Sequence, residues 1–470
     1  MGTKGADQFI IRMAPTALSV IQISDNGGTS FTSEVAASVT RIAVVSVEGN
    51  DTLTIDQSNG FVGKASGLAI HFDGDGGFNT LALKGSAGLG VTETLTQGAT
   101  PGTGTMTTSH ATGSATLTFT SASAIDDTTT ATSLTLNAGD SRNLLQVRNG
   151  PTIDGVSTMS VFGIDLQRVN MQNFNAGDPD GAAASDPFAA QLTANFERVR
   201  FANKTNVTIN TGDGNDFVVL NDSTTPTGVA LLMIDGGAGQ DVIAVRTQPM
   251  GTTTNFSNFE RTEQGAGAVF IQSLYQVRLS RPAAQSEIGF WLQVLIQQGV
   301  QAVVNGIENS QEAFTRLVQG FYVHFLGRQT SGGEEHGWVN ALVHGATEEQ
   351  VIGGIAGSPE FRMRANSMFT TGTADERFVR ALYQLLLNRT ASASEVQGWT
   401  PGTGQVQASA TVFGFLNSRE FRTDVVSAYY ISLLHRPSDP VGLESWVASK
   451  FDLGAIRAGF LGSTEFVQNF

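Results

Sequence analysis

Four tryptophans divide the second half of this 470-residue chain into repeated units, because a tyrosine precedes each tryptophan by the same 16 residues. A leucine and an arginine follow each tyrosine by four and six residues, and each unit closes on a phrase containing Ser, Glu and Phe. The tyrosine and tryptophan pairs are Tyr275 and Trp291, Tyr322 and Trp338, Tyr383 and Trp399, and Tyr430 and Trp446. Four registers of this kind predict four copies of one structural module.

The spacing of apolar residues within a unit indicates helices. Around Tyr383, for example, Phe378, Leu382 and Leu386 recur at intervals of four, the period of one helix face. The closing serine of each unit can cap a helix whose first turn holds the glutamate. The gaps between tryptophans are 47, 61 and 47 residues, so we expect the modules to pair as residues 266–368 and 369–470.

The composition changes near residue 265, where a second kind of domain ends. Residues 1–265 hold 19 Asp and 6 Glu, whereas the rest of the chain holds 4 Asp and 13 Glu. Aspartate suits turns and glutamate suits helices. The chain is therefore predicted to be multidomain, with an acidic, Gly/Asp/Thr-rich all-β region over residues 1–265 and an all-α repeat region after it.

A short phrase recurs through the first half: Gly, any residue, Asp or Asn, any residue, then a large apolar residue. Its acidic or amide positions are Asp7, Asp51, Asn79, Asn143 (in a looser copy), Asp216 and Asp241, and their separations are 44, 28, 64, 73 and 25. Most separations are near multiples of one coil of a parallel β-solenoid, which stacks like residues above like. A parallel β-helix is therefore expected, with irregular coils or an excursion over the Thr/Ser-rich segment from Thr94 to Thr135.

Two of these phrases resemble the hemolysin-type (RTX-like) calcium-binding nonapeptide: Gly236 to Ala244 throughout, and Thr211 to Val219 with one glycine missing. In that family the turns aim carboxylates and carbonyls at Ca²⁺, and the resemblance implies calcium as cofactor, with the candidate metal ligands Asp213, Asp216, Asp235 and Asp241. The family repeats its motif every nine residues, whereas the copies here lie 25 apart. The alternative is a metal-free ladder of stacked Asp and Asn turns.

The pattern Tyr-x-x-x-Leu-x-Arg, then Trp, then Ser-x-Glu-Phe resembles the uncharacterised helical repeat that follows hemolysin-type repeats in secreted bacterial proteins. That repeat is distantly similar to phycobilisome linker domains. The resemblance implies an extracellular or cell-surface protein, adhesive or matrix-associated and exported by type I secretion, and it implies no catalytic activity.

Charge and composition exclude several other functions. The formal net charge of −15 disfavours nucleic acid as a partner, because the phosphate backbone is also negative. No apolar stretch is long enough to predict a membrane span, and the absence of cysteine excludes disulfides and thiol chemistry. We expect a structural protein rather than an enzyme. Its expected partners are copies of itself, another surface protein or a polysaccharide.

Two alternatives remain open from the sequence. The first is a polysaccharide lyase or epimerase on the β-helix, with His71, Asp73 and Asp75 on one strand face as its candidate cluster; an ordinary solvent-facing histidine is the simpler interpretation. The second concerns the repeated Trp, Tyr and Arg residues, which form either module cores, with each arginine paired to a glutamate of its module, or a recognition surface.

Overall fold

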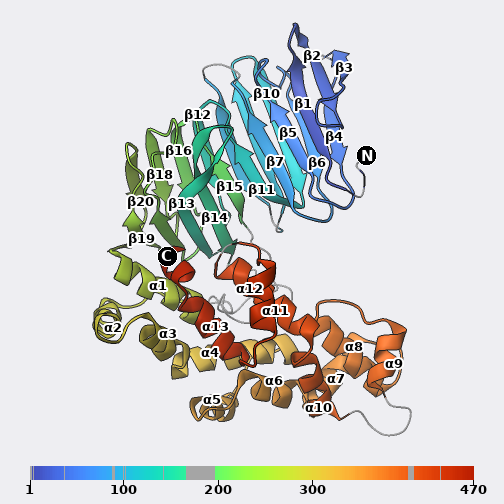
Figure 1. Cartoon of the computed structure of the whole chain (residues 1–470), viewed down its shortest axis with the longest axis vertical. Helices are drawn as coiled ribbons and strands as arrows, with labels where there is room; N and C mark the ends of the chain where they lie inside the picture. The colour runs from blue at the N-terminus through green and yellow to red at the C-terminus, as the bar shows by residue number, and fades with distance from the viewer. Residues whose placement is uncertain are drawn as a thin grey trace. The chain divides into compact units, whose positions relative to one another are not determined.

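The structure, a computed structural model, describes residues 3, 5–35, 38–86, 90–98, 100, 102–140, 142–165, 196–400, 407–434 and 436–469. The described chain forms two compact units with a boundary between Gly265 and Ala266 (Figure 1). We call the described residues up to 265 the β unit and those from 266 onward the helical unit. The prediction of a mostly β first half and a helical second half is confirmed.

The strands of the β unit lie in two sheets. The larger sheet runs in the order β21-β19-β17-β13-β14-β15-β11-β7-β5-β1-β2-β3, and the smaller in the order β20-β18-β16-β12-β8-β9-β10-β6-β4. The strand bounds are β1 Gln8–Ala14, β2 Ala17–Ser24, β3 Thr32–Val35, β4 Arg41–Val45, β5 Thr52–Asp56, β6 Leu68–Asp73, β7 Asn79–Lys84, β8 Thr92–Gln97, β9 Gly104–His110, β10 Gly113–Thr120, β11 Ala122–Asp127, β12 Ala131–Asn137, β13 Asn143–Ile153, β14 Val156–Asp165, β15 Phe196–Phe201, β16 Lys204–Asn210, β17 Phe217–Asn221, β18 Leu231–Asp235, β19 Val242–Thr247, β20 Thr253–Ser257 and β21 Arg261–Gln264.

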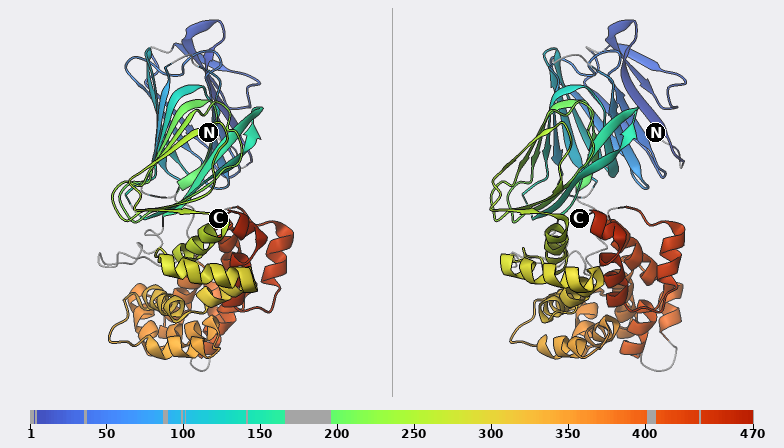
Figure 2. Two further views of the ribbon diagram at one scale, coloured as in Figure 1. Left: turned by 90° about the vertical axis from the view of Figure 1, so that its left-hand side faces the viewer. Right: turned by 60° about the vertical axis from the view of Figure 1, so that its left-hand side comes forward.

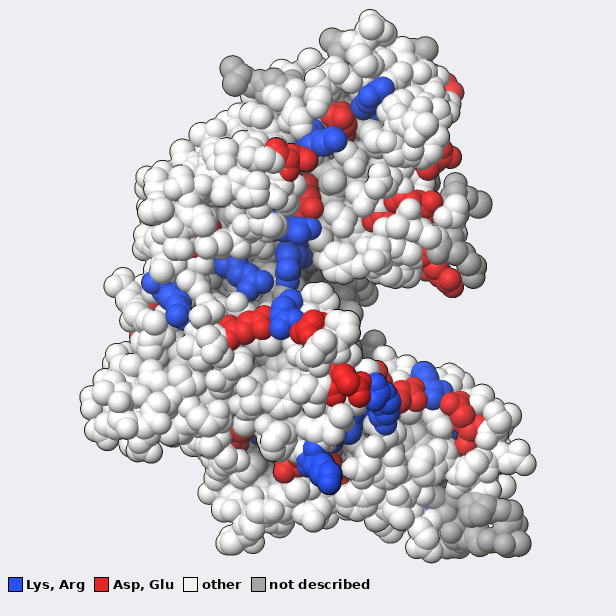
Figure 3. All heavy atoms as spheres, in the orientation of Figure 1, with Lys and Arg blue, Asp and Glu red and all other residues white. Residues whose placement is uncertain are grey.

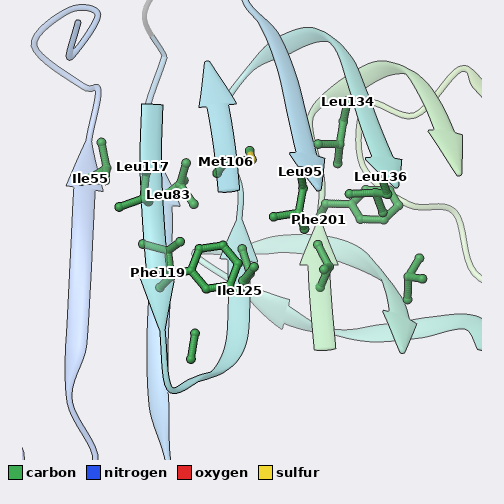
Figure 4. Close-up of a cluster of buried hydrophobic side chains, with 14 of the residues drawn as sticks. Ile55, Leu83, Leu95, Met106, Leu117, Phe119, Ile125, Leu134, Leu136 and Phe201 are labelled. Atoms are coloured by element: carbon green, nitrogen blue, oxygen red, sulfur yellow. The ribbon is translucent and has the colours of Figure 1, made fainter. Parts of the chain in front are cut away.

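The core of the β unit lies between the two sheets. Many strands bury alternate residues, as in β5, where Leu53 and Ile55 are buried and their neighbours are partly exposed. Figure 4 shows residues of both sheets meeting there, among them Ile125 from β11 and Leu117 from β10. This alternation is what half-buried strands require.

The sheets are mixed rather than parallel throughout. Neighbours such as β5 and β7, β16 and β18, and β17 and β19 pair in parallel. Three groups of consecutive strands pair antiparallel inside the same sheets: β1-β2-β3, β8-β9-β10 and β13-β14-β15. Figure 2 shows the two sheets from further sides. The expectation of a purely parallel sheet structure therefore does not describe this unit.

The segment from Thr94 to Thr135 is regular, which corrects the sequence prediction. It runs through β8, β9, β10, β11 and into β12. Burial alternates along this segment with a period of two: in β10, Leu117 and Phe119 are buried while Thr116 and Thr118 are exposed. Threonine is β-branched and suits strands, so the low complexity of this segment indicated strand rather than irregular coil.

The helical unit consists of short helices, and among the described residues none is long and apolar enough to cross a membrane. The bounds are α1 Ala266–Leu279, α2 Gln285–Gln298, α3 Val300–Glu308, α4 Gln311–Phe321, the π-helix η3 Tyr322–Leu326, α5 His336–Val343, α6 Glu348–Ala356, α7 Pro359–Met368, α8 Ala374–Leu386, α9 Ala393–Trp399, α10 Ala408–Leu416, α11 Arg419–Ser432, α12 Pro440–Val447, α13 Leu453–Leu461 and α14 Thr464–Asn469.

The closing serines cap helices, as predicted. Ser310, Ser358 and Ser418 precede α4, α7 and α11, and each side chain accepts a hydrogen bond from the backbone N–H three residues later. Ser463 makes the same bond before α14. The phenylalanine that ends each phrase is buried, so the cap fixes the helix start and the ring anchors it. The proposed pairing of modules into 266–368 and 369–470 stays a prediction.

Candidate functional site

The repeated arginine of each helical module is held by two carboxylates and the tyrosine ring. In the first module Nε of Arg281 donates to Oε1 of Glu312 at 2.7 Å, and Nη1 donates to Oε2 of Glu287 at 2.9 Å. The guanidinium carbon lies 4.9 Å from the centroid of the Tyr275 ring. Charge-assisted bonds of this fork geometry are among the stronger polar contacts in proteins. We call this arrangement the arginine clasp.

The clasp recurs in the other three modules. Its members are Arg328 with Glu334, Glu360 and Tyr322; Arg389 with Glu395, Glu420 and Tyr383; and Arg436 with Asp439, Glu465 and Tyr430. The four arginine side chains are each about a third exposed, between 32% and 36%. The prediction that each arginine pairs with a glutamate of its own module is confirmed, so these charges are neutralised inside the modules.

The clasp shifts the acidity of its carboxylates. Hydrogen bonds from Arg281 lower the pKa of Glu287 to about 2, and bonds from Arg389 lower the pKa of Glu395 to about 2. The pKa values of Glu334 and Glu360 are lowered by Arg328. Because these carboxylates stay ionised well into acid, the clasps persist over a wide range of pH.

Each tryptophan of the repeat is half-buried, between its tyrosine and a glycine of a later helix. Nε1 of Trp291 donates to the Tyr275 hydroxyl at 2.9 Å, and Nε1 of Trp399 donates to the Tyr383 hydroxyl at 3.3 Å. A Cβ added to the facing glycine would lie within 2.6 Å of the ring in every module. These glycines are Gly306, Gly354, Gly414 and Gly459. The rings therefore have a structural role, although one edge remains at the surface.

A buried ion network joins the first, second and fourth modules. Arg457 of α13 donates through Nε to Glu308 of α3, and its Nη1 donates to Oε2 of Glu348 of α6 at 3.1 Å. Arg278 of α1 reaches the other oxygen of Glu308 at 2.8 Å. All four side chains are at most 4% exposed. Burial opposes the charge of Arg457, but the two glutamates more than offset it and raise its pKa.

In the β unit, the Asp and Asn positions of the recurring phrase stack into a ladder. The backbone N–H of Asp7 donates to Oδ1 of Asp51 at 2.8 Å, and the N–H of Asp51 donates to Oδ1 of Asn79 at 2.9 Å. A second run follows, in which the N–H groups of Asn143 and Asp216 donate to Oδ1 of the next rung at 2.6 and 2.7 Å. That run ends where the N–H of Asp241 donates to Glu260 at 2.5 Å.

The first run of the ladder ends at Asn79. There, Asn79 donates through Nδ2 to the carbonyl oxygens of Gly74 and Ser121 at 2.8 and 3.0 Å.

The turns that carry the ladder stack closely. A Cβ on Gly237 would lie 1.8 Å from the Gly212 carbonyl oxygen, and Gly239 has a φ of 154°. Only glycine fits such a turn, which explains the glycines of the phrase.

The asparagine and aspartate rungs differ at the second polar atom of the side chain, which is Nδ2 in asparagine and Oδ2 in aspartate. Nδ2 of Asn143 donates to the carbonyl oxygens of Gly139 and Thr211 at 3.1 and 2.8 Å. Among the described residues, Oδ2 of Asp51, Asp216 and Asp241 has no hydrogen-bond partner. Burial raises the pKa of Asp216 to about 8 and that of Asp241 to about 6. A protonated Asp216 carries a hydrogen on one oxygen and so resembles the asparagine rungs.

The four candidate calcium ligands occupy different positions on two neighbouring turns. Oδ1 of Asp216 and of Asp241 accepts a ladder bond, and Oδ1 of Asp235 accepts from the N–H of Gly237 at 2.9 Å and from Asn258 at 2.8 Å. Asp213 is exposed. Within the described part of the chain no group of three or more His, Cys, Asp or Glu side chains is placed to hold a metal ion. These contacts fit the ladder better than a calcium site, and calcium binding stays a prediction.

The candidate catalytic cluster lies on the outer face of β6. His71 and Asp73 are partly exposed while Ile70 and Phe72, which alternate with them along the strand, are buried, so strand alternation placed the two correctly. His71 Nδ1 lies 3.0 Å from the Thr118 hydroxyl, and Asp73 Oδ1 accepts from Thr120 at 2.8 Å and from the N–H of Asp75 at 3.2 Å. These contacts tie the strand to β10 and its turn, and the described contacts suit a structural role.

Some members of these sites were missed by the sequence interpretation. The second carboxylate of the clasp stands six residues after the arginine in three modules and three residues after it in the last, as Asp439. The glycines under the tryptophans stand 13 to 16 residues after them, each inside a helix. Both registers are visible once the four modules are aligned. The buried network around Arg457 has no repeat, and therefore left no signal in the sequence.

The comparisons with known proteins identify one part of the helical unit. Residues 363–425 match the family model described as a domain of unknown function, DUF4214. The match runs from α7 into α11 and contains one complete unit of tyrosine, arginine, tryptophan and Ser-x-Glu-Phe. No curated protein and no solved structure matches this chain.

Proposed function

We propose that this chain is a structural protein of the bacterial cell surface or extracellular matrix, with a role in adhesion or assembly. The observation that carries the proposal is the reuse of the same polar contacts from module to module and from rung to rung. Four arginines are held in equivalent clasps, and the acidic phrases of the β unit bind the next turn. Side chains engaged in this way stabilise an extended repeat rather than a reacting substrate.

We propose further that the β unit is a β-solenoid with antiparallel hairpins inserted into its coils. Outside the three antiparallel groups, successive strands alternate between the two sheets, as in β16, β17, β18 and β19. Their parallel pairs are 25 residues apart in sequence, for example Val207 with Leu232 and Val218 with Ile243. One coil of about 25 residues that visits each sheet once accounts for both facts.

The proposed partners are further copies of this chain, another surface protein or a polysaccharide, and the site of action is extracellular. Figure 3 shows broad areas that carry neither acidic nor basic side chains, and a surface of low charge is suited to contacts that do not depend on ion pairing. On α2, Phe290 and Ile296 are 60% and 76% exposed. Exposed apolar side chains of this size support an assembly role for the helical unit.

Cell fractionation in the bacterium that encodes the chain tests this proposal. We expect a tagged protein in the medium or on the cell surface, where protease added to intact cells degrades it while a cytosolic marker survives. Extraction with and without a calcium chelator measures whether calcium holds it there. A protein found only in the cytosol would contradict the proposal.

The alternative, a polysaccharide lyase or epimerase, has a separate test. A lyase leaves an unsaturated sugar that absorbs ultraviolet light, and an epimerase changes the NMR spectrum of its polymer. We expect neither change when the purified chain is incubated with acidic polysaccharides. A change that is lost in His71→Ala would support the enzyme and overturn the structural proposal.

A further inference from the structure

A lysine and two acids are enclosed in the core of the β unit, apart from the ladder. Lys204 begins β16, Glu93 lies on β8, and Asp127 ends β11. Nζ of Lys204 lies 2.6 Å from Oε2 of Glu93 and 2.7 Å from Oδ1 of Asp127. The exposed fractions of these side chains are 0%, 0% and 1%. Water has almost no access to a charge cluster of this kind.

Thr129 completes the cluster and connects its two acids. Its hydroxyl donates to Oε1 of Glu93 at 2.7 Å and also contacts Oδ1 of Asp127. Its backbone N–H donates to the same Asp127 oxygen at 3.1 Å. Within the described residues, Oδ2 of Asp127 has no hydrogen-bond partner. The carboxyl group of Asp127 is therefore held on one side by Thr129 and Lys204, and its second oxygen is not engaged.

The cluster becomes electrically neutral when it binds one proton. Lys204 with two ionised acids has a net charge of −1, and burial raises the pKa of Glu93 to about 7. In the neutral cluster, transfer of a proton from Lys204 to Asp127 separates no charge; it produces a free amine beside a carboxylic acid. Burial in a low dielectric makes the uncharged pair easier to reach than it would be in water, because the ion pair loses its hydration.

The free amine remains the minor form. Burial lowers the pKa of Lys204, but the neighbouring Asp127 and Glu93 more than offset this and raise it. A reaction that needs the amine is therefore slow. One turnover in the life of the molecule is sufficient, and groups held within hydrogen-bonding distance react with a high effective concentration.

We propose that Lys204 and Asp127 form an intramolecular amide (isopeptide) bond in the folded β unit, with Glu93 as the proton carrier. Nζ of Lys204 attacks Cγ of Asp127, a C–N bond forms, and one carboxyl oxygen leaves as water. Glu93, which is protonated in the neutral cluster, gives its proton to the departing oxygen and takes up the proton lost by Nζ, by way of the Thr129 hydroxyl that contacts both acids. The amine and the acid give one amide and one water, and Glu93 ends as it began.

The bond would join chain positions that are 77 residues apart. A crosslink across a loop of that length restricts the unfolded chain and so stabilises the folded one. It would also replace an ion cluster by an uncharged amide. Both effects favour a protein that has to persist outside the cell without disulfides, although the test below does not depend on where the protein acts.

Mass spectrometry of the full-length chain, incubated at neutral pH, tests the proposal. We expect an intact mass lower than that of the sequence by one water molecule, and a proteolytic digest in which one branched peptide contains both Lys204 and Asp127. The unreacted mass, with the two residues in separate linear peptides, would overturn the proposal.

Three variants separate this bond from other losses of water. Lys204→Arg keeps the positive charge but has no primary amine, so it should show the full mass; a water loss that persists there would assign the dehydration to another site, such as an Asp-Gly succinimide. Glu93→Gln keeps the shape and should react much more slowly. Asp126→Asn changes the neighbouring acid, which pairs with Arg200, and should react as the parent does; circular dichroism confirms that each variant is folded.

Discussion

The two units accommodate buried or half-buried acidic side chains with opposite effects on their pKa. In the helical unit each repeated carboxylate faces an arginine, and hydrogen bonds from the arginine lower the pKa of Glu287 and of Glu395 to about 2. In the β unit the repeated acids face backbone N–H groups, and burial raises the pKa of Asp216 to about 8. The first arrangement depends on charge and the second on its absence, so the two units should differ in their response to pH and to the loss of a single side chain.

The two units also differ in how far the sequence separation between contacting residues can vary from repeat to repeat. A ladder rung needs only the backbone N–H of another turn, so the hydrogen-bonded rungs lie 25, 28, 44 or 73 residues apart, with hairpins inserted between them. A clasp needs four side chains of one module: the arginine, its tyrosine and two carboxylates. The arginine accordingly precedes its closing glutamate by 31, 32, 31 and 29 residues in the four modules.

The largest effect of a single change is expected at the buried network. Replacing Arg457 with Met leaves Glu348 buried without its cation and Glu308 with Arg278 alone, and should destabilise the helical unit by about 3 to 5 kcal/mol. All four tryptophans lie in this unit, so their fluorescence during urea unfolding measures it. As a control, Arg419→Met removes an exposed pair with Glu444 and should have a much smaller effect, because water screens an exposed ion pair. Equal effects would contradict the assignment of the network.

Removal of a repeated tryptophan should have the next largest effect. Trp399→Ala is expected to destabilise the helical unit by about 3 kcal/mol, near the lower end for aromatic truncations, because one edge of the ring is exposed; Trp338→Ala should behave alike. The measurement is thermal unfolding followed by circular dichroism without any ligand. If stability is unchanged and binding to a glycan or partner is lost, the ring is a recognition surface.

The glycine beneath the ring offers a sharper test of the same packing. In Gly414→Ala the new methyl group would lie 2.6 Å from Trp399, and we expect a loss of about 1 to 3 kcal/mol from overpacking. Gly398→Ala is the matched control in the preceding helix, where a Cβ has no neighbour within 4 Å. That change should be neutral or stabilise the helix by about 0.5 to 1 kcal/mol. Two equal responses would show that the ring does not rest on Gly414.

Calcium should have the smallest effect if the ladder needs no metal. Adding millimolar calcium to chelator-treated protein is then expected to leave the melting temperature of the β unit unchanged. A ligand that binds only the folded state raises that temperature by mass action. A rise that disappears in Asp241→Asn would support the calcium alternative and contradict the metal-free ladder.

The sequence predicted local and repeated features well. The register of Tyr, Arg and Trp led to the clasps, the Ser-x-Glu-Phe phrase to the helix caps, and the Asp and Asn phrase to rungs such as Asp51 and Asn79 that stack in space. In each case the information lies within one module or one turn, where spacing alone determines which residues meet.

The features that the sequence did not reveal depend on distant partners. Strand β10 pairs in parallel with β6, where Leu117 lies beside Ile70, and its Thr-rich sequence does not show this distant partner. The same is true of Lys204, whose carboxylate partner Glu93 lies 111 residues away. Neither contact belongs to a repeat, so no internal comparison could have indicated it.

The response of the β unit to pH tests the central contrast most directly, and Asp216→Asn is the variant that isolates it. An unfolded aspartate has a pKa of about 3.9, whereas burial raises that of Asp216 to about 8. From about pH 4 to about pH 8 the folded state therefore holds a proton that the unfolded state has released, so the contribution of Asp216 to stability falls as the pH rises. Asparagine keeps the Oδ1 acceptor and cannot ionise.

Calorimetry of the parent and of Asp216→Asn across this pH range gives the comparison, and tryptophan fluorescence identifies the transition of the helical unit. We predict that the β unit of the parent loses stability relative to that of the variant as the pH rises toward about 8, while the helical transition is the same in both proteins. A difference that does not change with pH, or one in which the parent gains on the variant, would show that Asp216 is ionised in the fold and would contradict the account.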